Sequence, residues 1–531
     1  MIKKRLQIWL PLLLSLAMVL GMYFGYKMRD GMPKKGFFYV EKQRPIQEIL
    51  DLVRSKYVDD VDISSLSDTA IAAIMYRLDP HSQYIPASSV ERANEDISGS
   101  FYGIGIEFNV FDDTLHVVNV IKDGPAFKAG LITGDKLLKA ADSVIAGRKK
   151  TSDEIRNLLR GNRGSALPLV VLRGSKTFNA VVERNFIPVS SIDAAYMIDK
   201  VVGFVRINKF STQTYKEFMQ SLEMLKKSGM KKLVLDLRGN GGGVLDEAVE
   251  IADEFLEGDR LITYTEGKHR DRKDYRSRRE GQFEKGQIII LADEGTASAS
   301  EVLIGALQDW DRAEVVGRPT FGKGLVQEQF DLSDKSAVRL TVSRYYTPLG
   351  RSIQRSYSEG NKTYYENAAK RYYARDSIVP DSINLKNGKS FVTKKGKTVL
   401  EGGGINPDYF IAGDTAKMGM STAKLFSRGL LNTYGYRFAV DNADLLKQYK
   451  TPGEFSKSFT ISDSSWKYFE TRALQDTIDL RNITNGEKLF LLKTFKLSVA
   501  RQLWRHEGYF NVFNKEDPMV IKAVEVLTSK K

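Results

Sequence analysis

The alternation of strand and helix patterns between Val201 and Gln354 constrains the fold of this chain more than any other feature. The run "KKLVLDL" is continuously apolar at its centre, which is typical of a strand buried on both faces. "TQTYKEFMQSLEMLKKSG" has helical spacing and ends in a glycine cap, and "GQIIILAD" and "AEVVG" read as further strands. The sequence therefore predicts an α/β core built around a buried sheet.

The 531-residue chain has room for further domains, and its sequence pattern differs on either side of this core. Helical patterns precede it, short strands with glycine turns lie between, and a basic helical region follows. We expect seven segments: 1–36, an N-terminal anchor and linker; 37–97, helical; 98–188, a small β domain; 189–358, the core; 359–400, an insertion; 401–414, a strand returning to the core; and 415–531, helical and basic.

The N-terminal segment has the length and polarity of a membrane anchor. After Lys3, Lys4 and Arg5, the chain carries no charge from Ile8 to Tyr26. At about 1.5 Å per residue, a helix of that length spans roughly 28 Å, close to the hydrocarbon thickness of a bilayer. The following "GMYFGYKM" offers no good cleavage site, which favours an uncleaved anchor over a removed signal peptide. We expect a single-pass inner-membrane protein whose folded part is exported to the periplasmic side.

Composition excludes several kinds of site. The chain has no cysteine, which excludes disulfides, thiol catalysis and thiolate metal sites. Its four histidines are far apart in the sequence, so a histidine metal site has little support. The net charge of +14 comes from basic residues interleaved with acids, so we expect no nucleic-acid partner.

The small β domain at 98–188 resembles a PDZ domain. The resemblance rests on "GIGI" at 103–106, "GPAFKAGL" followed by "GD", and "LLRGNRG" at 158–164, in that order. A PDZ domain adds an extended peptide to a sheet edge and captures its terminal carboxylate with backbone amides. The resemblance assigns this role to the loop formed by Gly103, Ile104, Gly105 and Ile106. The alternative is that these glycines only form tight β turns.

The segment "GRPTFGKGLVQ" at 317–327 matches a phosphate-binding loop as far as Lys323. A nucleotide site next needs Ser or Thr for magnesium, and then a helix whose N-terminus faces the phosphates. The chain has Gly324 instead, followed by "LVQEQFDL", which alternates like a strand. Nucleotide binding is therefore not expected.

Two other glycine-containing segments follow predicted buried strands, where chemistry gathers in open α/β sheets. In "LDLRGNGGGVLDEAVEIADEFL" the strand runs into a glycine turn whose N–H groups can converge on an anion or an oxyanion. In "LADEGTASASEVLIGALQDW" a serine lies at a strand-to-helix junction, as in a nucleophile elbow. Taken alone, Ser298 or Ser300 is better explained as a helix cap.

A serine nucleophile needs a base, and no histidine lies near these loops in the sequence. Lysine is the known substitute. To act near neutral pH, Lys323 needs its pKa lowered by about 3 units from roughly 10.4, which costs about 4 kcal/mol. Burial alone can lower the pKa that far, whereas a neighbouring carboxylate would oppose it. Strand alternation would place Gln327 on the same face, where its oxygen orients the amine. We therefore interpret Lys323 as a base.

Together these segments closely resemble the carboxyl-terminal processing proteases, also called tail-specific proteases. The resemblance rests on "GTASASE" at 295–301, "GRPTFGKGLVQ" and "LDLRGNGGG", preceded by "LDPHSQY" and the PDZ-like segment in the family's order. It covers roughly residues 40–355 and "GGGINPD" at 402–408. It implies an α+β or α/β multidomain protein, with a β-sheet protease core, flanking helices and helical N- and C-terminal parts.

Carried over by position, the resemblance implies a serine endopeptidase that works through an acyl-enzyme. Ser298 would be the nucleophile, Lys323 the general base and Gln327 the residue that orients the base. Ser300 would be structural, and Thr296 stands at a non-reacting position where serine is common. No metal, nucleotide or other cofactor is implied.

The same resemblance places the oxyanion hole at the backbone N–H groups of Ala299 and Gly242, with Gly243 as the alternative glycine. It implies protein or peptide substrates with accessible C-termini, bound or gated by the PDZ domain. A homodimer is compatible with the helical ends. The rival reading is a PDZ adaptor on an inactive protease scaffold, for which loss of Ser298, Lys323 or Gln327 would be the sign.

Overall fold

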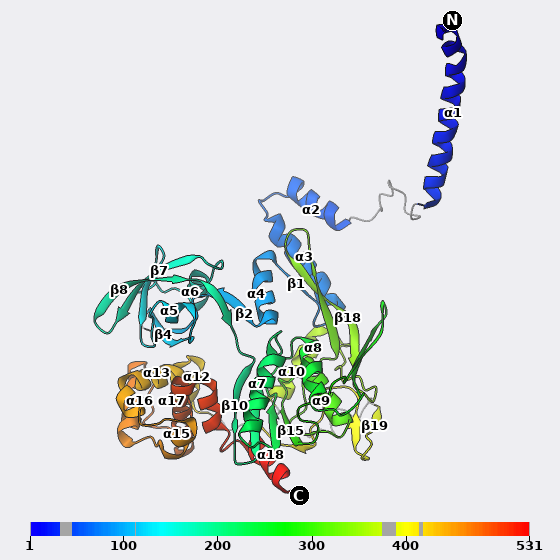
Figure 1. Ribbon diagram of the computed structural model, residues 1–531. Coiled ribbons are helices and arrows are strands. Elements are labelled where there is room, and N and C mark those ends of the chain that lie inside the picture. The colour runs from blue at the N-terminus through cyan, green and yellow to red at the C-terminus, as the bar shows by residue number, and fades with distance from the viewer. Residues whose placement is uncertain (1, 32–44, 112, 374–388, 414–417, 530–531) are drawn as a thin grey trace. The chain divides into compact units, whose positions relative to one another are not determined.

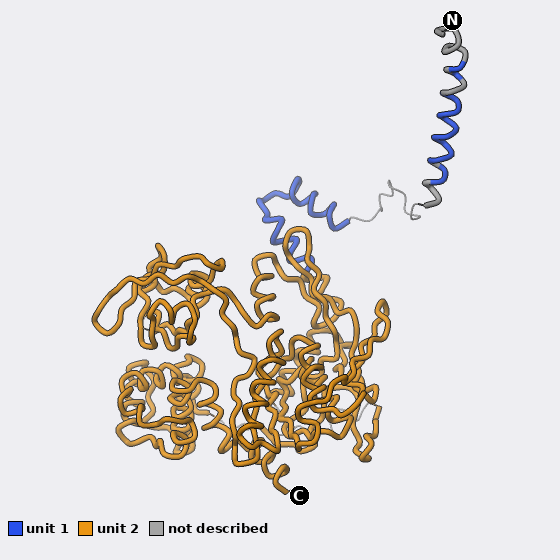
Figure 2. Tube along the Cα trace, in the orientation of Figure 1, with its two compact units in different colours: residues 1–71 blue, residues 72–531 orange. Residues whose placement is uncertain are grey.

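The computed structural model describes residues 2–31, 45–111, 113–373, 389–413 and 418–529 (Figure 1). The chain divides into two compact units, residues 1–71 and 72–531, which are described separately (Figure 2). The first unit is helical. It contains helices α1 (Ile2–Gly31) and α2 (Pro45–Lys56) and the start of α3 (Ile63–Leu78). The helical texture predicted for the N-terminal region is therefore confirmed.

Helix α1 covers the uncharged stretch for which the sequence predicts a membrane anchor. Within the part of the chain that the structure describes, no helix combines the length and the apolar character needed to cross a lipid bilayer.

A six-stranded sheet forms the centre of the second unit, in the order β10-β11-β12-β15-β16-β21. The edge strand β10 pairs antiparallel with β11, and all other pairs are parallel. The continuous apolar runs of the sequence form its three central strands, and so the predicted α/β core is confirmed. The strand bounds are β10 (Ile192–Met197), β11 (Val202–Ile207), β12 (Lys232–Asp236), β15 (Gln287–Ala292), β16 (Glu314–Gly317) and β21 (Tyr409–Phe410).

Helices cover both faces of this sheet because successive side chains of a strand point to opposite faces. On one face, Val205 and Leu235 are buried under α7 (Thr214–Lys227), α8 (Leu245–Asp253) and α9 (Ala299–Asp309). On the other, Phe204 and Val234 are buried under α18 (Pro518–Ser529). The end of the chain, in which the sequence shows no motif, thus supplies one layer of the core.

A second sheet lies beside the first and carries the segment that follows Lys323. Its order is β1-β18-β13-β14, and β17 also pairs with β18. The bounds are β1 (Gln83–Ile85), β13 (Leu261–Gly267), β14 (Arg270–Arg276), β17 (Leu325–Asp331) and β18 (Ala337–Tyr346). The lysine is followed by a strand and not by a helix, as the sequence indicates.

One detail of that prediction is wrong. Lys323 precedes β17, and the pairing of β17 with β18 shifts between Val326 and Gln327. Strand alternation therefore does not run unbroken from Lys323 to Gln327. The two side chains meet because of the loop and the bulge together.

The PDZ-like region forms a sheet of order β3-β4-β5-β7-β8, with β6 paired to β5 and two short helices. Strands β2 (Ser100–Gly103) and β9 (Asn185–Pro188) pair antiparallel with each other and carry both connections of this region. Helix α4 (Ala87–Ser98) leads into β2. The remaining bounds are β3 (Ile106–Phe111), β4 (Thr114–Val120), α5 (Pro125–Lys128), β5 (Lys136–Ala140), β6 (Ser143–Val144), α6 (Ser152–Leu159), β7 (Ala166–Arg173) and β8 (Lys176–Glu183).

The insertion and the C-terminal region complete the second unit. The insertion contributes α10 (Asn361–Tyr373) and the hairpin β19 (Ser390–Val392) with β20 (Thr398–Leu400). The C-terminal helices enclose an aromatic-rich core of their own. They are α12 (Met420–Ser427), α13 (Leu430–Asp441), α14 (Ala443–Leu446), α15 (Pro452–Ser458), α16 (Asp463–Gln475) and α17 (Asn485–Phe513).

The layer formed by α18 predicts a stability effect. Phe204 is fully buried between the sheet and α18. Phe204→Ala should lower the free energy of unfolding by about 3–5 kcal/mol, because it removes a large buried ring and leaves a cavity. Phe330, which is 43% exposed, is the matched control. Phe330→Ala should change the free energy of unfolding by less than about 0.5 kcal/mol. Denaturant unfolding measures both, and equal effects would contradict the assigned layer.

Candidate active site

Ser298 lies in a sharp turn between β15 and α9. Its φ of 57° and ψ of −119° are rare for a non-glycine residue and cost about 1–3 kcal/mol. Ser298 is the N-cap residue of α9 and pairs with Glu301 in a capping box, in which the Glu301 side chain accepts from the N–H of Ser298. Such a strained strand-to-helix turn is typical of a residue that presents its hydroxyl for reaction.

The neighbouring hydroxyl groups are buried and bonded instead. Ser300 Oγ donates to the carbonyl oxygen of Asn240 at 3.0 Å, and Thr296 Oγ1 donates to that of Leu237 at 2.9 Å. Both hydroxyls therefore tie the start of α9 to the chain leaving β12. These contacts fit the structural role that the resemblance implies for Ser300.

The glycine turn after β12 lies directly against Ser298. A Cβ atom added to Gly242 would lie 2.7 Å from the Cβ of Ser298 and 2.9 Å from the backbone nitrogen of Ala299. The φ of Gly242 is +93°, which disfavours any other residue. Only glycine therefore lets the turn approach the serine this closely.

The predicted oxyanion donors differ in their present partners. The N–H of Gly242 donates to Oδ1 of Asn240 at 2.9 Å, so it is engaged within the turn. Among the hydrogen bonds of the described residues, none uses the N–H of Ala299. The alternative, Gly243, packs against the backbone of Phe210. The oxyanion hole thus stays a prediction at both glycines.

A buried carboxylate joins the serine turn to the lysine loop. Oε2 of Glu301 accepts hydrogen bonds from the backbone N–H groups of Ser298 at 2.8 Å and Lys323 at 2.9 Å. Its Oε1 accepts from the N–H of Gly322 at 2.8 Å and the hydroxyl of Thr320 at 2.5 Å. The two residues predicted as nucleophile and base are therefore held at one oxygen atom.

Reasoning from the sequence missed Glu301, although a signal was present. Ser298 and Glu301 have the spacing of a capping box, in which the acid at the third helical position reaches back to the first N–H. The structure forms that half of the box. The bonds from Glu301 to the loop at 320–323 join segments that no local pattern relates.

Tyr345 was also missed, and the sequence holds no signal for it. Its buried hydroxyl lies 2.6 Å from the carbonyl oxygen of Lys323 and 3.1 Å from that of Ser298. The phenol of β18 therefore bridges the same two loops from the carbonyl side.

The amine of Lys323 is oriented by Gln327. Lys323 Nζ donates to Gln327 Oε1 at 2.8 Å, and Gln327 Nε2 donates to the carbonyl oxygen of His81 at 2.5 Å. Because the amide nitrogen must face a carbonyl, the amide oxygen must face the lysine. The N–H of His81 in turn donates to Oδ1 of Asp79 at 2.8 Å. The segment "LDPHSQY" thus fixes the glutamine. No hydrogen bond among the described residues joins Ser298 Oγ to Lys323 Nζ.

Burial governs the electrostatics of this lysine. It lowers the pKa of Lys323 below its ordinary value, and the positive charge of Arg339 adds to this effect. Asp79 and Glu301 act in the opposite direction without reversing it. Burial and the charge of Lys323 also lower the pKa of His81 to about 4, so that imidazole is neutral at pH 7.

Helix α10 of the insertion packs over the segment that holds Gln327. Tyr364 OH lies 3.0 Å from Nε2 of His81. The amide nitrogen of Asn361 donates to the carbonyl oxygen of Asp79 at 3.2 Å. The sequence assigns no role to the insertion, and the structure shows that its helix α10 contacts the segment whose carbonyl orients Gln327.

The predicted peptide-binding loop has a mixed structure. Ile104 is buried in the core of the PDZ-like region, and its carbonyl oxygen accepts from the N–H of Ala126 at 2.8 Å. Gly105 has a φ of +77°, and Ile106 begins β3. Gly103 ends β2, opposite Asn185 of β9. The loop therefore turns the chain from the β2–β9 pair into an edge strand.

Known proteins share these features. Residues 201–361 match peptidase family S41, and residues 103–183 match the PDZ domain family. The chain is 34% identical over 313 residues to a carboxy-terminal-processing protease of Bartonella bacilliformis, covering 58% of this chain and 71% of that protein. It is 36% identical over 310 residues to a probable CtpA-like serine protease of Staphylococcus aureus, covering 58% and 62%. A solved photosystem II D1 C-terminal processing protease matches with 28% identity and a TM-score of 0.35, covering 59% and 84%.

The family matches and the two bacterial relatives define a serine-type peptidase. The chain belongs to peptidase family S41 and is a carboxy-terminal processing serine protease with a PDZ domain. The rival reading, an adaptor on an inactive scaffold, has no support in a chain that retains Ser298, Lys323 and Gln327.

The close approach of the glycine turn predicts a sharp effect of one methyl group. Gly242→Ala should lower the peptidase rate by about 10²-fold or more, because displacing a reacting group by about 1 Å costs that much. Gly241→Ala is the control, since a Cβ at Gly241 meets nothing within 4 Å. Peptidase assays compare the two variants, and equal rates would contradict the assigned contact.

The shared carboxylate predicts a positioning effect. Glu301→Gln keeps the shape but replaces one of two accepting oxygens with a donor that faces N–H groups. We expect a rate loss of at least about tenfold, together with a lower thermal midpoint, since buried donors left without acceptors cost about 1–3 kcal/mol each. Glu328→Gln is the control, since the Glu328 side chain is 43% exposed and pairs only weakly at the surface with Arg270; it should change neither quantity.

Proposed function

We propose that this protein is an endopeptidase that cleaves proteins presented by their C-terminal tails, with a Ser298–Lys323 dyad. The observation that carries the proposal is the attachment of both residues to Glu301. Among the described residues, the lysine amine, desolvated by burial, donates to the uncharged amide of Gln327. A half-buried serine in a strained turn and an amine of lowered pKa are the two parts that acyl transfer without histidine requires.

The proposed reaction has two stages. The neutral amine of Lys323 takes the proton of Ser298 Oγ as that oxygen attacks the carbonyl carbon of the scissile peptide bond. The resulting lysine ammonium gives the proton to the departing amine, the C–N bond breaks, and an acyl-enzyme ester forms. Lys323 then removes a proton from water, which attacks the ester. The carboxylic acid product leaves, and Ser298 regains its proton.

Developing negative charge on the carbonyl oxygen would be stabilised by the N–H of Ala299 and a glycine N–H of the turn at 240–243. Removing one such donor typically costs about 10²–10³ in rate. Because the N–H of Gly242 is engaged with Asn240, its use in the reaction would require the turn to exchange that partner.

Hydrolysis of an unstructured protein with an apolar C-terminus tests the dyad. Ser298→Ala and Lys323→Ala should each lower the rate by at least about 10³-fold. Lys335→Ala is the control, since Lys335 lies in an exposed turn before β18. Should both dyad variants cut at the parental rate, the assignment of nucleophile and base is wrong.

The protonation state of Lys323 predicts the pH dependence. Only the neutral amine accepts a proton. The rate should therefore be low at pH values below the pKa of Lys323, rise as the pH passes that pKa, and level off once Lys323 is deprotonated. Gln327→Glu places a carboxylate beside the ammonium, which raises the pKa of Lys323 and should move the rising limb to higher pH. Gln220→Glu, on an exposed position of α7, is the control and should leave the limb in place. A pH–rate profile of the parent and the two variants shows whether the rising limb moves as expected.

From the sequence alone we also propose that residues 8–26 anchor the protein in the inner membrane, with the catalytic part exported. Fractionation of intact and permeabilised cells is the test. The anchor should keep the protein with membranes after an alkaline wash, and an external protease should reach it once the outer barrier is opened. Release by the wash would contradict the anchor, and protection would contradict export.

A further inference from the structure

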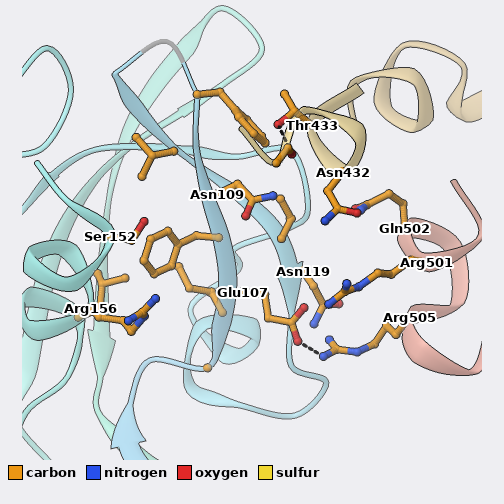
Figure 3. Close-up of a pocket in the computed structure, with 18 of the residues that line it drawn as sticks. Glu107, Asn109, Asn119, Ser152, Arg156, Asn432, Thr433, Arg501, Gln502 and Arg505 are labelled. Atoms are coloured by element: carbon orange, nitrogen blue, oxygen red, sulfur yellow. Dashed lines mark hydrogen bonds and ion pairs between the residues drawn. The ribbon is translucent and has the colours of Figure 1, made fainter. Parts of the chain in front are cut away.

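A cavity of about 710 Å³ lies between the PDZ domain and the C-terminal helices (Figure 3). Strand β3 runs through its middle, α6 forms one wall, and α13 and α17 form the opposite wall. Strand β3 is an edge strand, paired only with β4 among the described residues. Its second edge is therefore available for an added strand.

The cavity is strongly basic. Its described lining includes five arginines and one carboxylate, that of Glu107. Arg160 is paired with Glu95 at 2.6 Å, and Arg156 is paired with Asp153. Arg501 and Arg428 have no ion pair with any described carboxylate within 4 Å. The helical wall thus carries positive charge with which no carboxylate of the described residues pairs.

One ion pair already crosses the cavity. Arg505 of α17 donates to the Glu107 carboxylate of β3, as Figure 3 shows. Arg505 lies at a kink in α17, with a φ of 56°, and Arg501 lies one turn earlier on the same helix. The kink directs Arg505 toward the strand that an incoming tail would extend.

The geometry of strand addition decides which tail residues meet these arginines. A tail whose carboxylate binds at the loop 103–106 runs antiparallel to β3 from that loop onward. Its side chains alternate between the two faces of the sheet. On one face of the sheet, the side chains of the tail lie next to those of Ile106 and Phe108, which pack on the PDZ core. On the other face, they lie next to those of Glu107 and Asn109.

With the terminal side chain on the apolar face, the second-last and fourth-last side chains lie on the face of Glu107 and Asn109. In Figure 3 Glu107 points toward Arg505, and Arg501 lies beside Arg505 on the same helix. We propose that Arg501 and Arg505 select C-terminal tails that carry Asp or Glu at the second-last or fourth-last position. The proposal rests on the tail-binding part of the proposed function and adds the charge of the substrate to it.

Peptide binding tests this selection without any cleavage. Full-length protein with Ser298→Ala is titrated against labelled ten-residue peptides that end in alanine and differ only in Glu, Gln or Lys at the two positions. We expect the Glu peptide to bind about 5- to 10-fold more tightly than the Gln peptide, as two partly exposed ion pairs allow. The preference should shrink as salt is raised.

Variants locate the effect. Arg501→Gln combined with Arg505→Gln should abolish the preference for Glu, whereas Arg148→Gln, an exposed arginine elsewhere in the PDZ domain, should keep it. Glu107→Gln should tighten the Glu peptide alone, because it releases Arg505 from its present partner. Weaker binding of the Glu peptide to Glu107→Gln would contradict the proposal.

Equal affinity for Glu and Gln peptides in the parent, or a preference that survives the double substitution, overturns the selection and leaves the peptidase proposal intact. If no peptide binds at all, both the selection and tail capture by the PDZ domain are wrong. The hydrolysis assay with Ser298 and Lys323 variants then still decides the catalytic assignment on its own.

Discussion

The candidate active site depends on the hydrogen bonds of one buried carboxylate. Glu301 receives four donors, from Ser298, Lys323, Gly322 and Thr320. A buried carboxylate is costly unless it is fully bonded. Four donors offset that cost, and they also bind the first turn of α9 to the loop before β17. The serine and the lysine are thus placed by a backbone scaffold rather than by contact between their own side chains.

Patterns of the sequence predicted those features that reside in single segments. The buried runs around Leu235 and Ile290 became central strands, and the glycine turn after β12 lies against Ser298. The roles of Lys323 and Gln327 followed from the residues themselves, and the choice of Ser298 as nucleophile followed from the family resemblance. The geometry is compatible with each role. Contacts between distant segments were out of reach. Glu301 showed only its capping-box spacing, and Tyr345 showed nothing, because their bonds depend on how two sheets pack.

The contacts around Gln327 are another example of structure that local sequence patterns do not predict. Gln327 is oriented by a carbonyl group more than two hundred residues earlier in the chain, and α10 of the insertion holds that carbonyl segment in place. A basic helical tail without motifs likewise hides the fact that α18 covers one face of the sheet. Local periodicity identifies an amphipathic helix, but it does not say which surface the helix will cover.

The antiparallel pairing of β2 with β9 has a consequence for how the molecule is put together. Ser100 faces Pro188 and Gly103 faces Asn185, so the polypeptide leaves the catalytic body and comes back to it at neighbouring points. The PDZ domain is therefore a module whose two connections to the rest of the unit form one two-stranded stem. The segment at 79–81 precedes this module and Gln327 follows it, so the catalytic body is made of discontinuous chain. The residues that hold the lysine thus come from segments on either side of the module, and the paired stem keeps those two segments together.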